Sequence, residues 1–358
     1  MKTKPLSGLN VLELATVLAG PSVGMFFAEL GANVTKIEHP GSGGDVTRSW
    51  KLHSESESAR HSAYFASVNY GKKHLFIDLK DDEGVKHVRQ LAAASDIIIS
   101  NHTEAQSAKF GLDFLTVKAT NPTVIYGHIT GYGEKNERPA YDVVLQAEAG
   151  YMFMNGQAGS EPTKLPIALI DMLAAHQLKE GLLLALWNRQ RTGEGALVSA
   201  SLLDAAVSAL SNQATNWLMG GHIATRDGSI HPNISPYGEL LTTSDGKQIV
   251  LAVGSDAHFQ NLCNVLGLGQ LASDVRFTTN QHRVVNRKAL HDILLAAALN
   301  FSSQNLMTAF ALKKVPAGLV KNMKEVFEGG NNDHMLLKDT MEDGAIAIRP
   351  KQVAFEIR

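Results

Sequence analysis

Asp171 is the residue of this chain whose position first suggests chemistry. It follows the apolar run Ile167 to Ile170 and precedes a helical pattern that continues to Trp187. The second half of this pattern is apolar on every side, so we expect the helix to be buried. A carboxylate at the start of a helix lies near unpaired backbone amides, and Asp is a common N-cap there. From these residues alone, capping is the commoner role for Asp171, and catalysis is the alternative.

A G-x-S-x-G match at Gly20 to Gly24 lies between a predicted strand and a predicted helix, as it does in serine hydrolases. Pro21, however, makes Ser22 an ordinary residue of the first helical turn, which disfavours a hydrolase. The dinucleotide fingerprint G-x-G-x-x-G is absent from this loop. The stretch Leu18 to Pro21 instead contains small residues that let a ligand approach a helix N-terminus, where negative charge is favoured.

Several cations are expected near one edge of the predicted sheet. Lys80 lies just past the carboxyl end of a predicted strand, and Arg48, Lys109 and Arg138 are further candidates. Each of them alone is more commonly a solvated side chain, but together they suggest a polyphosphate ligand. The 14 histidines form no H-E-x-x-H motif and no Cys/His cluster, so we expect no metal site.

Composition restricts the class of protein. A chain of 358 residues is long enough for two domains, and 44% hydrophobic against 19% charged residues is typical of a globular protein. The formal net charge of −2 gives no general attraction to nucleic acid or to an acidic membrane, so we expect neither as a partner. Cys263 is the single cysteine, which excludes an internal disulfide. Because Leu14 to Ala28 is interrupted by Pro21 and too short to span a bilayer, we identify no export signal and expect a cytoplasmic protein.

Strand and helix patterns alternate through the first part of the chain. We predict strands at residues 10–15, 33–38, 74–79, 96–100, 123–129 and 196–202, and helices at 21–30, 82–94 and 116–120. This alternation predicts an α/β fold with a doubly wound, mostly parallel sheet and right-handed crossovers. Ligands of such sheets bind beyond the carboxyl ends of the strands.

The pattern changes after about residue 205. An Asp245-Gly246 turn between two apolar segments predicts a hairpin over residues 236–253, and helical patterns follow at 258–266, 287–299 and 303–312. We therefore predict a large domain over residues 1–204, a connection over 205–235 and a smaller α+β domain over 236–318. Residues 319–358 are predicted to be a return linker and a C-terminal part of the large domain.

An ordered set of motifs runs from one end of the chain to the other. It begins with the segment from Leu6 to Arg48 and continues with shorter matches at Asn69–Lys72, Ile77–Lys80, Asn121–Pro122, Ile129–Gly133, Ala168–Asp171, Asn188–Gly195, Pro236–Gly238, Asp245–Gly246, Asp274–Phe277 and Arg283–Arg287. This set resembles the class III coenzyme A transferases, the family of formyl-CoA and carnitine CoA-transferases that also includes α-methylacyl-CoA racemases. The resemblance covers nearly the whole chain.

The resemblance implies a role for particular residues. Asp171 would be the catalytic carboxylate, which attacks an acyl-CoA thioester to give a mixed anhydride. Coenzyme A would be a substrate rather than a permanently bound cofactor, and a carboxylic acid would be the second substrate. The residues implied to bind CoA are Leu18, Ala19, His39, Ile77, Lys80, Asn101, Lys109, Arg138 and Tyr141. The family's fold would be Rossmann-like, in a homodimer of two interlocked chains.

Some positions differ from the family pattern. His39 and Lys109 stand where arginines are usual, and Lys offers only a point charge to a phosphate. Ala175 replaces a glycine one turn after Asp171, which narrows the space beside the carboxylate. Leu18 stands where formyl-CoA transferases have a glutamine, so an oxalate or formate substrate is disfavoured.

Three classes of function follow. The first is an acyl-CoA:carboxylate CoA-transferase with Asp171 as the nucleophile. The second is an α-methylacyl-CoA racemase, in which a histidine–aspartate pair moves a proton. The racemase signature G-H-D-I-N-Y aligns with Ala140 to Leu145, which contains no histidine, although His176 could in principle act as the base. The third is a non-catalytic CoA-binding protein in which Asp171 is only a cap.

Overall fold

The computed structural model describes residues 4–136, 138–341 and 343–357. These residues form two compact units. The smaller unit consists of Met154–Pro162 and Thr225–Asn332, and the larger unit contains the rest of the described chain.

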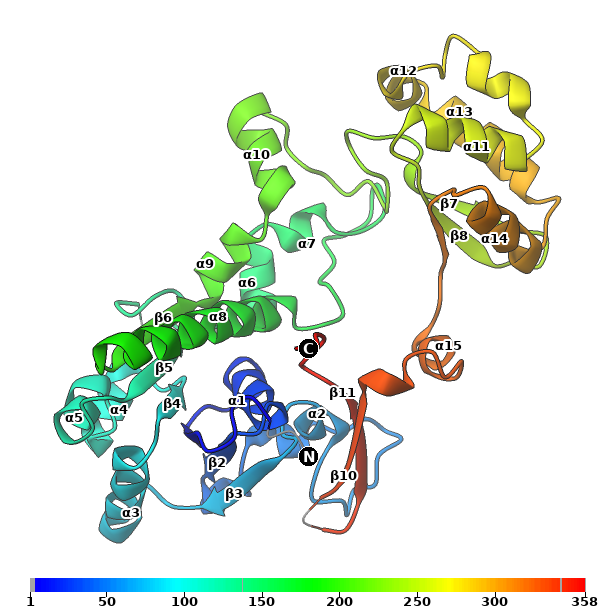
Figure 1. The fold of residues 1–358 in the computed structure, drawn as a ribbon. Coiled ribbons are helices and arrows are strands. Elements are labelled where there is room, and N and C mark those ends of the chain that lie inside the picture. The colour runs from blue at the N-terminus through cyan, green and yellow to red at the C-terminus, as the bar shows by residue number, and fades with distance from the viewer. Residues whose placement is uncertain (1–3, 137, 342, 358) are drawn as a thin grey trace. The chain divides into compact units, whose positions relative to one another are not determined.

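A six-stranded sheet forms the centre of the larger unit (Figure 1). Its strands are β1 (Asn10–Glu13), β2 (Asn33–Glu38), β3 (Lys72–Phe76), β4 (Ile97–Ser100), β5 (Ile125–Thr130) and β6 (Ala196–Ser201). The order is β3-β2-β1-β4-β5-β6, and all five neighbouring pairs are parallel. The predicted α/β class with a parallel sheet is therefore confirmed. The strand expected at 74–79 lies earlier, because Lys72 to Phe76 pair with β2 and the chain then turns before α3.

Helices cover both faces of this sheet. The longer helices of the larger unit are α1 (Ala19–Glu29), α3 (Asp82–Ala93), α4 (Glu104–Phe110), α5 (Phe114–Thr120), α6 (Asp142–Glu148), α8 (Leu169–Thr192), α9 (Leu202–Ser208) and α10 (Ser211–Gly220), of which α10 buries none of its residues. The short ones are α2 (Ala63–Ala66), α7 (Tyr151–Met154) and the 3-10 turns Pro40–Ser42, Val46–Ser49 and Asp333–Met335. Helices α1 and α8 pack on one face, and α3 and α5 pack on the other.

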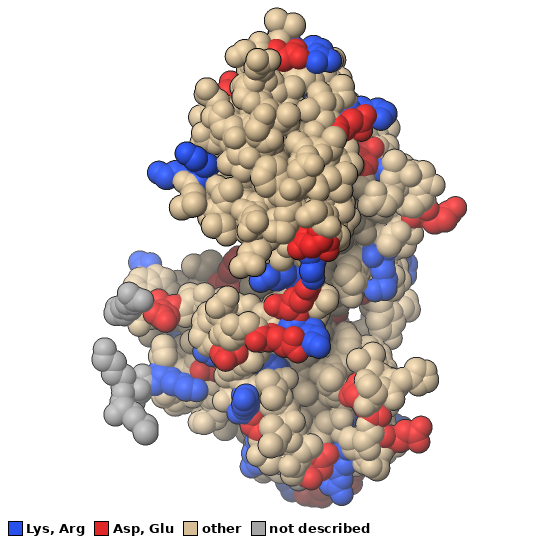
Figure 2. Space-filling model, turned by 90° about the vertical axis from the view of Figure 1, so that its right-hand side faces the viewer, with Lys and Arg blue, Asp and Glu red and all other residues tan. Residues whose placement is uncertain are grey.

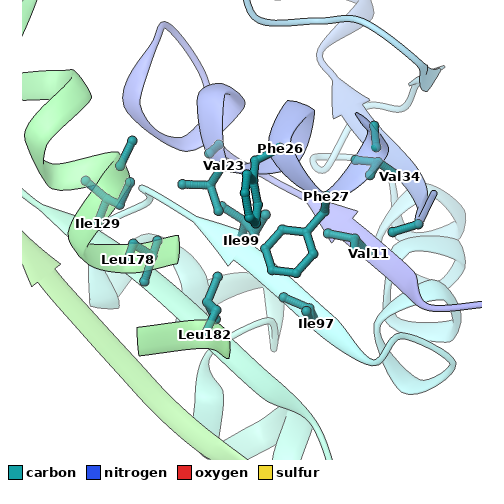
Figure 3. Close-up of a cluster of buried hydrophobic side chains, with 14 of the residues drawn as sticks. Val11, Val23, Phe26, Phe27, Val34, Ile97, Ile99, Ile129, Leu178 and Leu182 are labelled. Atoms are coloured by element: carbon teal, nitrogen blue, oxygen red, sulfur yellow. The ribbon is translucent and has the colours of Figure 1, made fainter. Parts of the chain in front are cut away.

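The apolar core of the larger unit follows from the alternation of side chains along the strands. Val11, Ile97 and Ile99 point to the face that α1 and α8 cover, while Leu12 and Ile98 point to the opposite face. Figure 3 shows the first set meeting the phenylalanines of α1 and the leucines of α8, namely Phe26, Phe27, Leu178 and Leu182. The two helices that frame the catalytic candidate are thereby fixed to the same sheet face.

Helix α8 departs from the sequence prediction. Leu178 and Leu182 are fully buried, but Leu184 and Trp187 are 69% and 62% exposed, so the prediction that its second half is buried on every side is wrong. The physical reason is that α8 presents one side to the sheet and leaves the opposite side uncovered in the described chain. The helix also continues past Trp187 to Thr192 and ends at Gly193, whose φ of +76° suits a C-cap.

The smaller unit is an α+β unit. Its sheet is β7 (Tyr237–Thr242), β8 (Gln248–Ala252) and β9 (Ala317–Leu319), in the antiparallel order β7-β8-β9. Its helices are α11 (Asp256–Val265), α12 (Asn280–Val285), α13 (Arg287–Ala298), α14 (Ser303–Leu312) and α15 (Met323–Phe327), with a 3-10 turn at Gly269–Ser273. Cys263 is fully buried in its apolar core, as expected for a packing residue.

The boundaries of the units differ in detail from the predicted ranges. Residues 154–162 belong to the smaller unit, because Gly156 O accepts a hydrogen bond from Gly228 N at 2.9 Å and Ser160 O accepts one from Arg226 Nε at 2.7 Å. The predicted connection over 205–235 contains most of α9 and all of α10, which belong to the larger unit. The hairpin of β10 (Leu336–Thr340) and β11 (Ile346–Pro350) also belongs to the larger unit.

No single helix of the described residues is long and apolar enough to cross a membrane. The bent pair α13 and α14 passes that test by length and composition together, and both helices supply side chains to the core of the smaller unit, among them Leu290, Leu294 and Phe310. On the face drawn in Figure 2, basic and acidic side chains are interspersed rather than gathered by sign.

Gly24 on α1 lies directly against the buried side chain of Glu13. A Cβ at Gly24 would be 1.8 Å from Glu13 Oε2 and 3.3 Å from Lys72 Cε. Both of these side chains are fully buried, so neither can swing into solvent. We expect Gly24→Ala to lower the free energy of unfolding by about 1–3 kcal/mol, even after the gain of roughly 1 kcal/mol that Ala makes over Gly inside a helix.

Urea or thermal denaturation measures this change. Gly269→Ala is the matched control, because a Cβ there meets only Asn264 Oδ1, at 3.6 Å. An unchanged stability of Gly24→Ala would mean that α1 can move away from β1 without loss, contrary to the packing described here.

Candidate active site

The strand order of the larger sheet reverses between β1 and β4, and a cavity of about 480 Å³ opens beyond the carboxyl ends of these two strands. Neighbouring connections that leave a parallel sheet in opposite directions create such a crevice. The loop after β1 lines it with Thr16 to Ala19, and the loop after β4 lines it with Asn101 to Glu104. Asp171 on α8 and Tyr141, the residue just before α6, also line the cavity. We call this space the Asp171 cavity.

A second cavity, of about 490 Å³, adjoins the first. The two share Thr16, His102 and Gln106 as lining residues, so one ligand long enough can occupy both. We call the second space the lysine cavity, because Lys80 and Lys109 line it together with His39 and Ile77.

The ten residues to which the resemblance assigns catalysis or CoA binding all line one of these two cavities. Leu18, Ala19, Asn101, Arg138, Tyr141 and Asp171 line the Asp171 cavity. His39, Ile77, Lys80 and Lys109 line the lysine cavity. The structure therefore brings the candidates together, and their individual roles remain predictions.

Asp171 is not the N-cap of α8. The helix begins at Leu169, its N-cap position is Ala168, and Asp171 lies in its first turn. The carboxylate that serves this helix start comes from α6, because Asp142 Oδ2 accepts the N–H of Ile170 at 3.2 Å. The capping interpretation of Asp171 is therefore wrong, since another carboxylate performs that role.

Gln146, also on α6, holds the segment that leads into α8. Its Oε1 accepts the N–H of Leu165 at 2.7 Å, while its Nε2 donates to Asp142 Oδ1 at 2.6 Å and to Ile167 O at 3.3 Å. Gln146 is itself buried. Helix α6 thus fixes the direction in which α8 presents Asp171.

The carboxyl group of Asp171 is buried without a hydrogen-bond or ion-pair partner among the described residues, and the whole residue is 9% exposed. Burial, and after it the charge of Asp142, raise the pKa of Asp171 to about 7. Burial also raises the pKa of Asp142. A desolvated carboxylate with a raised pKa is a stronger nucleophile than a solvated one, because no hydrogen bond has to be broken before it attacks.

Tyr64 on α2 lies close enough to this carboxylate to respond to its charge. Burial raises the pKa of Tyr64 to about 12, with further contributions from Asp171, Asp142 and Asp45. Its ring packs edge-on against Trp50, with centroids 5.1 Å apart. The phenol therefore stays protonated at neutral pH.

The candidate CoA-binding cations differ in whether other residues already engage their charged groups. His39 is engaged on both ring nitrogens, since Nδ1 accepts the N–H of Gly41 at 2.9 Å and Nε2 lies 3.3 Å from Asp78 Oδ1. Arg138 contacts Tyr132 and Glu148 through one guanidinium nitrogen. Lys80 and Lys109 are exposed at the lysine cavity, with no ion-pair partner among the described residues.

Arg48, which the sequence analysis grouped with these cations, serves a different purpose. Its guanidinium is buried against Glu38, with Nε to Oε2 at 2.7 Å, and it lies 3.9 Å from the centre of the Phe65 ring. It is therefore paired within the protein rather than free for a phosphate.

Two further candidates are excluded by position. Ser22 of the G-x-S-x-G match is fully buried in α1, and its hydroxyl donates to Gln352 Oε1 at 2.8 Å, as expected for an ordinary helix residue. His176, the possible racemase base, is exposed and lines neither cavity. Among the residues that the structure describes, no group of three or more His, Cys, Asp or Glu side chains is placed to hold a metal ion.

Sequence reasoning missed several residues that line or support the site. His102 borders both cavities, and its Nδ1 is buried without a partner. Asp142 accepts the N–H of Ile170 at the start of α8, and Asp45 accepts the N–H of Val17 in the loop after β1. Both aspartates lie inside matched or aligned segments, so their motifs carried a signal, but their contacts join residues 28 positions apart and leave no pattern in the sequence.

These features define a class of protein: a parallel α/β enzyme in which one buried, unpaired carboxylate faces a two-part cavity. Comparison with known proteins makes the assignment specific. A family model described as CoA-transferase family III matches residues 6–355, and the chain belongs to this family of enzymes.

Relatives and solved structures agree with this assignment. The chain is 38% identical to the succinate–glutarate CoA-transferase of Agrobacterium fabrum over 329 residues, which covers 90% of this chain and 82% of the relative. It is 35% identical to the human succinyl-CoA:glutarate CoA-transferase, over 90% of this chain and 73% of the relative. A crystal structure of a CaiB/BaiF family protein from Brucella suis is 36% identical and superposes with a TM-score of 0.86, covering 99% of this chain and 93% of that chain.

The ionisation of Asp171 predicts the pH dependence of transfer. With Asp171 as the predicted nucleophile, only the ionised carboxylate would attack, so the rate of transfer should rise with pH through an acid limb centred at about 7. Asp142→Asn keeps an oxygen to accept the N–H of Ile170 but removes the neighbouring charge that helps to raise the pKa. We therefore expect this limb to move to lower pH in the variant, measured as kcat/KM against pH. A limb that stays in place or moves to higher pH would contradict the coupling of the two carboxylates.

Proposed function

We propose that this protein is an acyl-CoA:carboxylate CoA-transferase that works through covalent intermediates on Asp171. The observation that carries the proposal is the carboxyl group of Asp171, which is buried, unpaired and open to a cavity. That cavity adjoins a second one with two free lysines, Lys80 and Lys109, which suit the phosphates of CoA. In this arrangement the thioester lies beside Asp171 and the nucleotide end lies at the lysines.

The proposed reaction conserves the thioester bond. An oxygen of Asp171 attacks the carbonyl carbon of the acyl-CoA, the C–S bond breaks, and CoA leaves as a thiolate with an acyl-aspartyl anhydride behind it. The thiolate attacks the aspartyl carbonyl, which releases the donor acid and leaves an aspartyl-CoA thioester. The acceptor carboxylate attacks this thioester, the C–S bond breaks, and CoA leaves again as a thiolate with a second anhydride, between the acceptor and Asp171, behind it. The thiolate then attacks the new acyl carbonyl and restores the free carboxylate.

Two features of the site support these steps. Each attack places negative charge on a carbonyl oxygen, and backbone amides at a helix start are suited to stabilise it. The start of α1 provides such amides at Leu18 and Ala19, which line the Asp171 cavity. The anhydrides would hydrolyse in contact with water, so the burial of Asp171 also protects them.

The named relatives favour dicarboxylic acids as substrates. Besides the succinate–glutarate enzyme, the succinyl-CoA:mesaconate CoA-transferase of Haloarcula hispanica is 32% identical over 95% of this chain. We therefore propose that this protein exchanges CoA between succinyl-CoA and a second dicarboxylate. Leu18, at the position where formyl-CoA transferases have a glutamine, further disfavours formate and oxalate.

The proposal includes the assembly and location that the resemblance and composition imply. We expect a Rossmann-like large domain and an interlocked homodimer, so light scattering on the purified protein should give twice the mass of one chain. The single, buried Cys263 supports a reducing, cytoplasmic setting. A monomer at working concentration that retains full activity would contradict the dimer.

Replacing the nucleophile tests the mechanism. Asp171→Asn has nearly the same shape but cannot form the anhydride, so kcat should fall by roughly a thousandfold or more while CoA still binds. With the native protein and succinyl-CoA, hydroxylamine should modify only the peptide that contains Asp171, as shown by mass spectrometry. Transfer that survives both Asp171→Asn and Asp171→Ala would refute the assignment.

Two further assays on the native protein distinguish the transferase from the alternative functions. A racemase would exchange the α-hydrogen of a methyl-branched acyl-CoA with deuterated water and leave the peptide unmodified. A non-catalytic binder would retain CoA in calorimetry but show neither transfer nor exchange. The exposed position of His176, away from both cavities, argues against the racemase.

A further inference from the structure

The loop between β1 and α1 adopts a conformation that its residues do not prefer. Thr16, Val17 and Leu18 all line the Asp171 cavity. Val17 has a φ of +72°, in the left-handed region that β-branched residues rarely adopt. A residue remains in this region only where surrounding contacts hold it there. The shape of the cavity wall therefore depends on contacts from outside the loop.

One of these contacts comes from the loop after β4. Asn101 Oδ1 accepts the N–H of Thr16 at 3.2 Å, and Asn101 Nδ2 donates to the carbonyl of the same residue at 3.1 Å. Both ends of the side-chain amide are thus used to hold the backbone beside Val17.

A second contact reaches Val17 itself. Asp45 accepts the N–H of Val17, with the closer oxygen, Oδ2, at 3.2 Å. Asp45 is held in turn by Lys36, whose Nζ lies 3.1 Å from Asp45 Oδ2. Lys36 also donates to the carbonyl of Ala15 at 2.5 Å, so the same ammonium group fixes both sides of the turn.

The Asp45–Lys36 pair is fully buried, since both side chains have no exposed surface. Although burial alone would lower it, Glu13 and then Asp45 hold the pKa of Lys36 above its usual value. Lys36 therefore keeps its charge beside Asp45, and neither side chain can leave without stranding the other in a buried site. This gives the contact to Val17 a rigid support.

The loop leads directly into the first turn of α1. No side chain caps this helix, and the amides of Leu18, Ala19 and Gly20 have no hydrogen-bond acceptor among the described residues. Pro21 has no N–H, and of the other three residues Leu18 and Ala19 line the Asp171 cavity, so their amides are the donors that the helix start offers there. Their direction is set by the backbone of Val17 immediately before them.

We propose that Asp45 is a positioning residue for the transfer reaction: itself held by Lys36, it accepts the N–H of strained Val17 and so directs the free amides of α1 at the oxyanion that forms beside Asp171. This inference rests on the proposed function and adds the means by which its oxyanion site is built. Amides stabilise an oxyanion only when they are directed at it in advance, and a displacement of about 1 Å can cost roughly 100-fold in rate.

The first test is Asp45→Asn, which keeps the size of the side chain but removes its charge against Lys36. We expect kcat for transfer to fall by roughly 10- to 100-fold. The Kd for CoA, measured by calorimetry, should be nearly unchanged, because the amides act on the transition state rather than on bound CoA. A wall residue of the lysine cavity with no positioning role would instead change the Kd and leave kcat intact.

A double-mutant cycle supplies a readout that a merely structural role would not give. Val17→Gly removes the strain that Asp45 opposes, since Gly adopts a positive φ freely. In the Asp45→Asn background, this second change should restore part of the lost kcat. Strictly additive effects of the two substitutions would overturn the proposal.

Asp81→Asn is the matched control. Asp81 makes the same kind of bond, accepting the N–H of Gly84 at 3.1 Å at the start of α3, but lines neither cavity. The transfer rate of Asp81→Asn should equal that of the native protein. If Asp45→Asn does not fold, Asp45→Glu retains the charge and moves the oxygens by one bond, so a folded variant with reduced kcat supports the proposal.

The outcomes separate this inference from the proposed function. Native kcat in folded Asp45→Asn or Asp45→Glu, with Asp171→Asn inactive, overturns the positioning role alone. An active Asp171→Asn overturns the proposed function and the positioning role with it.

Discussion

The chemistry proposed for this fold depends on one carboxylate, Asp171, that is largely buried and yet left unpaired. A helix start normally stabilises an ionised aspartate through its free amides, and this would lower the nucleophilicity of Asp171. Asp142 prevents that outcome, because it takes the N–H of Ile170 for itself. The same residue contributes the charge that, after burial, raises the pKa of Asp171. One neighbouring side chain thus removes a competing hydrogen bond and keeps the nucleophile basic.

The topology of the sheet explains why this carboxylate lies beside two adjoining cavities, where CoA is proposed to bind. The chain leaves β1 and β4 in opposite directions, so the two loops diverge and leave a crevice. Thr16 and His102, one from each loop, border both cavities. A CoA thioester needs separate surroundings for its two ends, apolar and dry at the acyl carbonyl and cationic at the phosphates. The two cavities separate the largely buried Asp171 from the exposed Lys80 and Lys109 within a single parallel sheet.

Local patterns in the sequence were sufficient for many of the strands and helices, whereas the list of cavity residues came from the resemblance to the family. The strands at β2 and β6 and the helix α14 were predicted almost to the residue, because their periodicity and flanking turns are local signals. The capping of α8 by Asp142 was not predicted, since it joins residues 28 positions apart. The exposed side of α8 was missed for a related reason: an apolar residue such as Trp187 carries no mark of which side meets the sheet.

Buried charged side chains on β1, β2 and β3 support the loop between β1 and α1. Glu13 on β1 pairs with Lys36 on β2 and with Lys72 on β3, all without exposed surface. Buried ion pairs seldom add net stability over apolar packing, because desolvation offsets their attraction. Their geometry, however, is exacting, since each charge is tolerated only beside its partner. We therefore attribute the network to precision rather than to stability: it fixes the strand ends from which the cavity loops, and Val17 among them, depart.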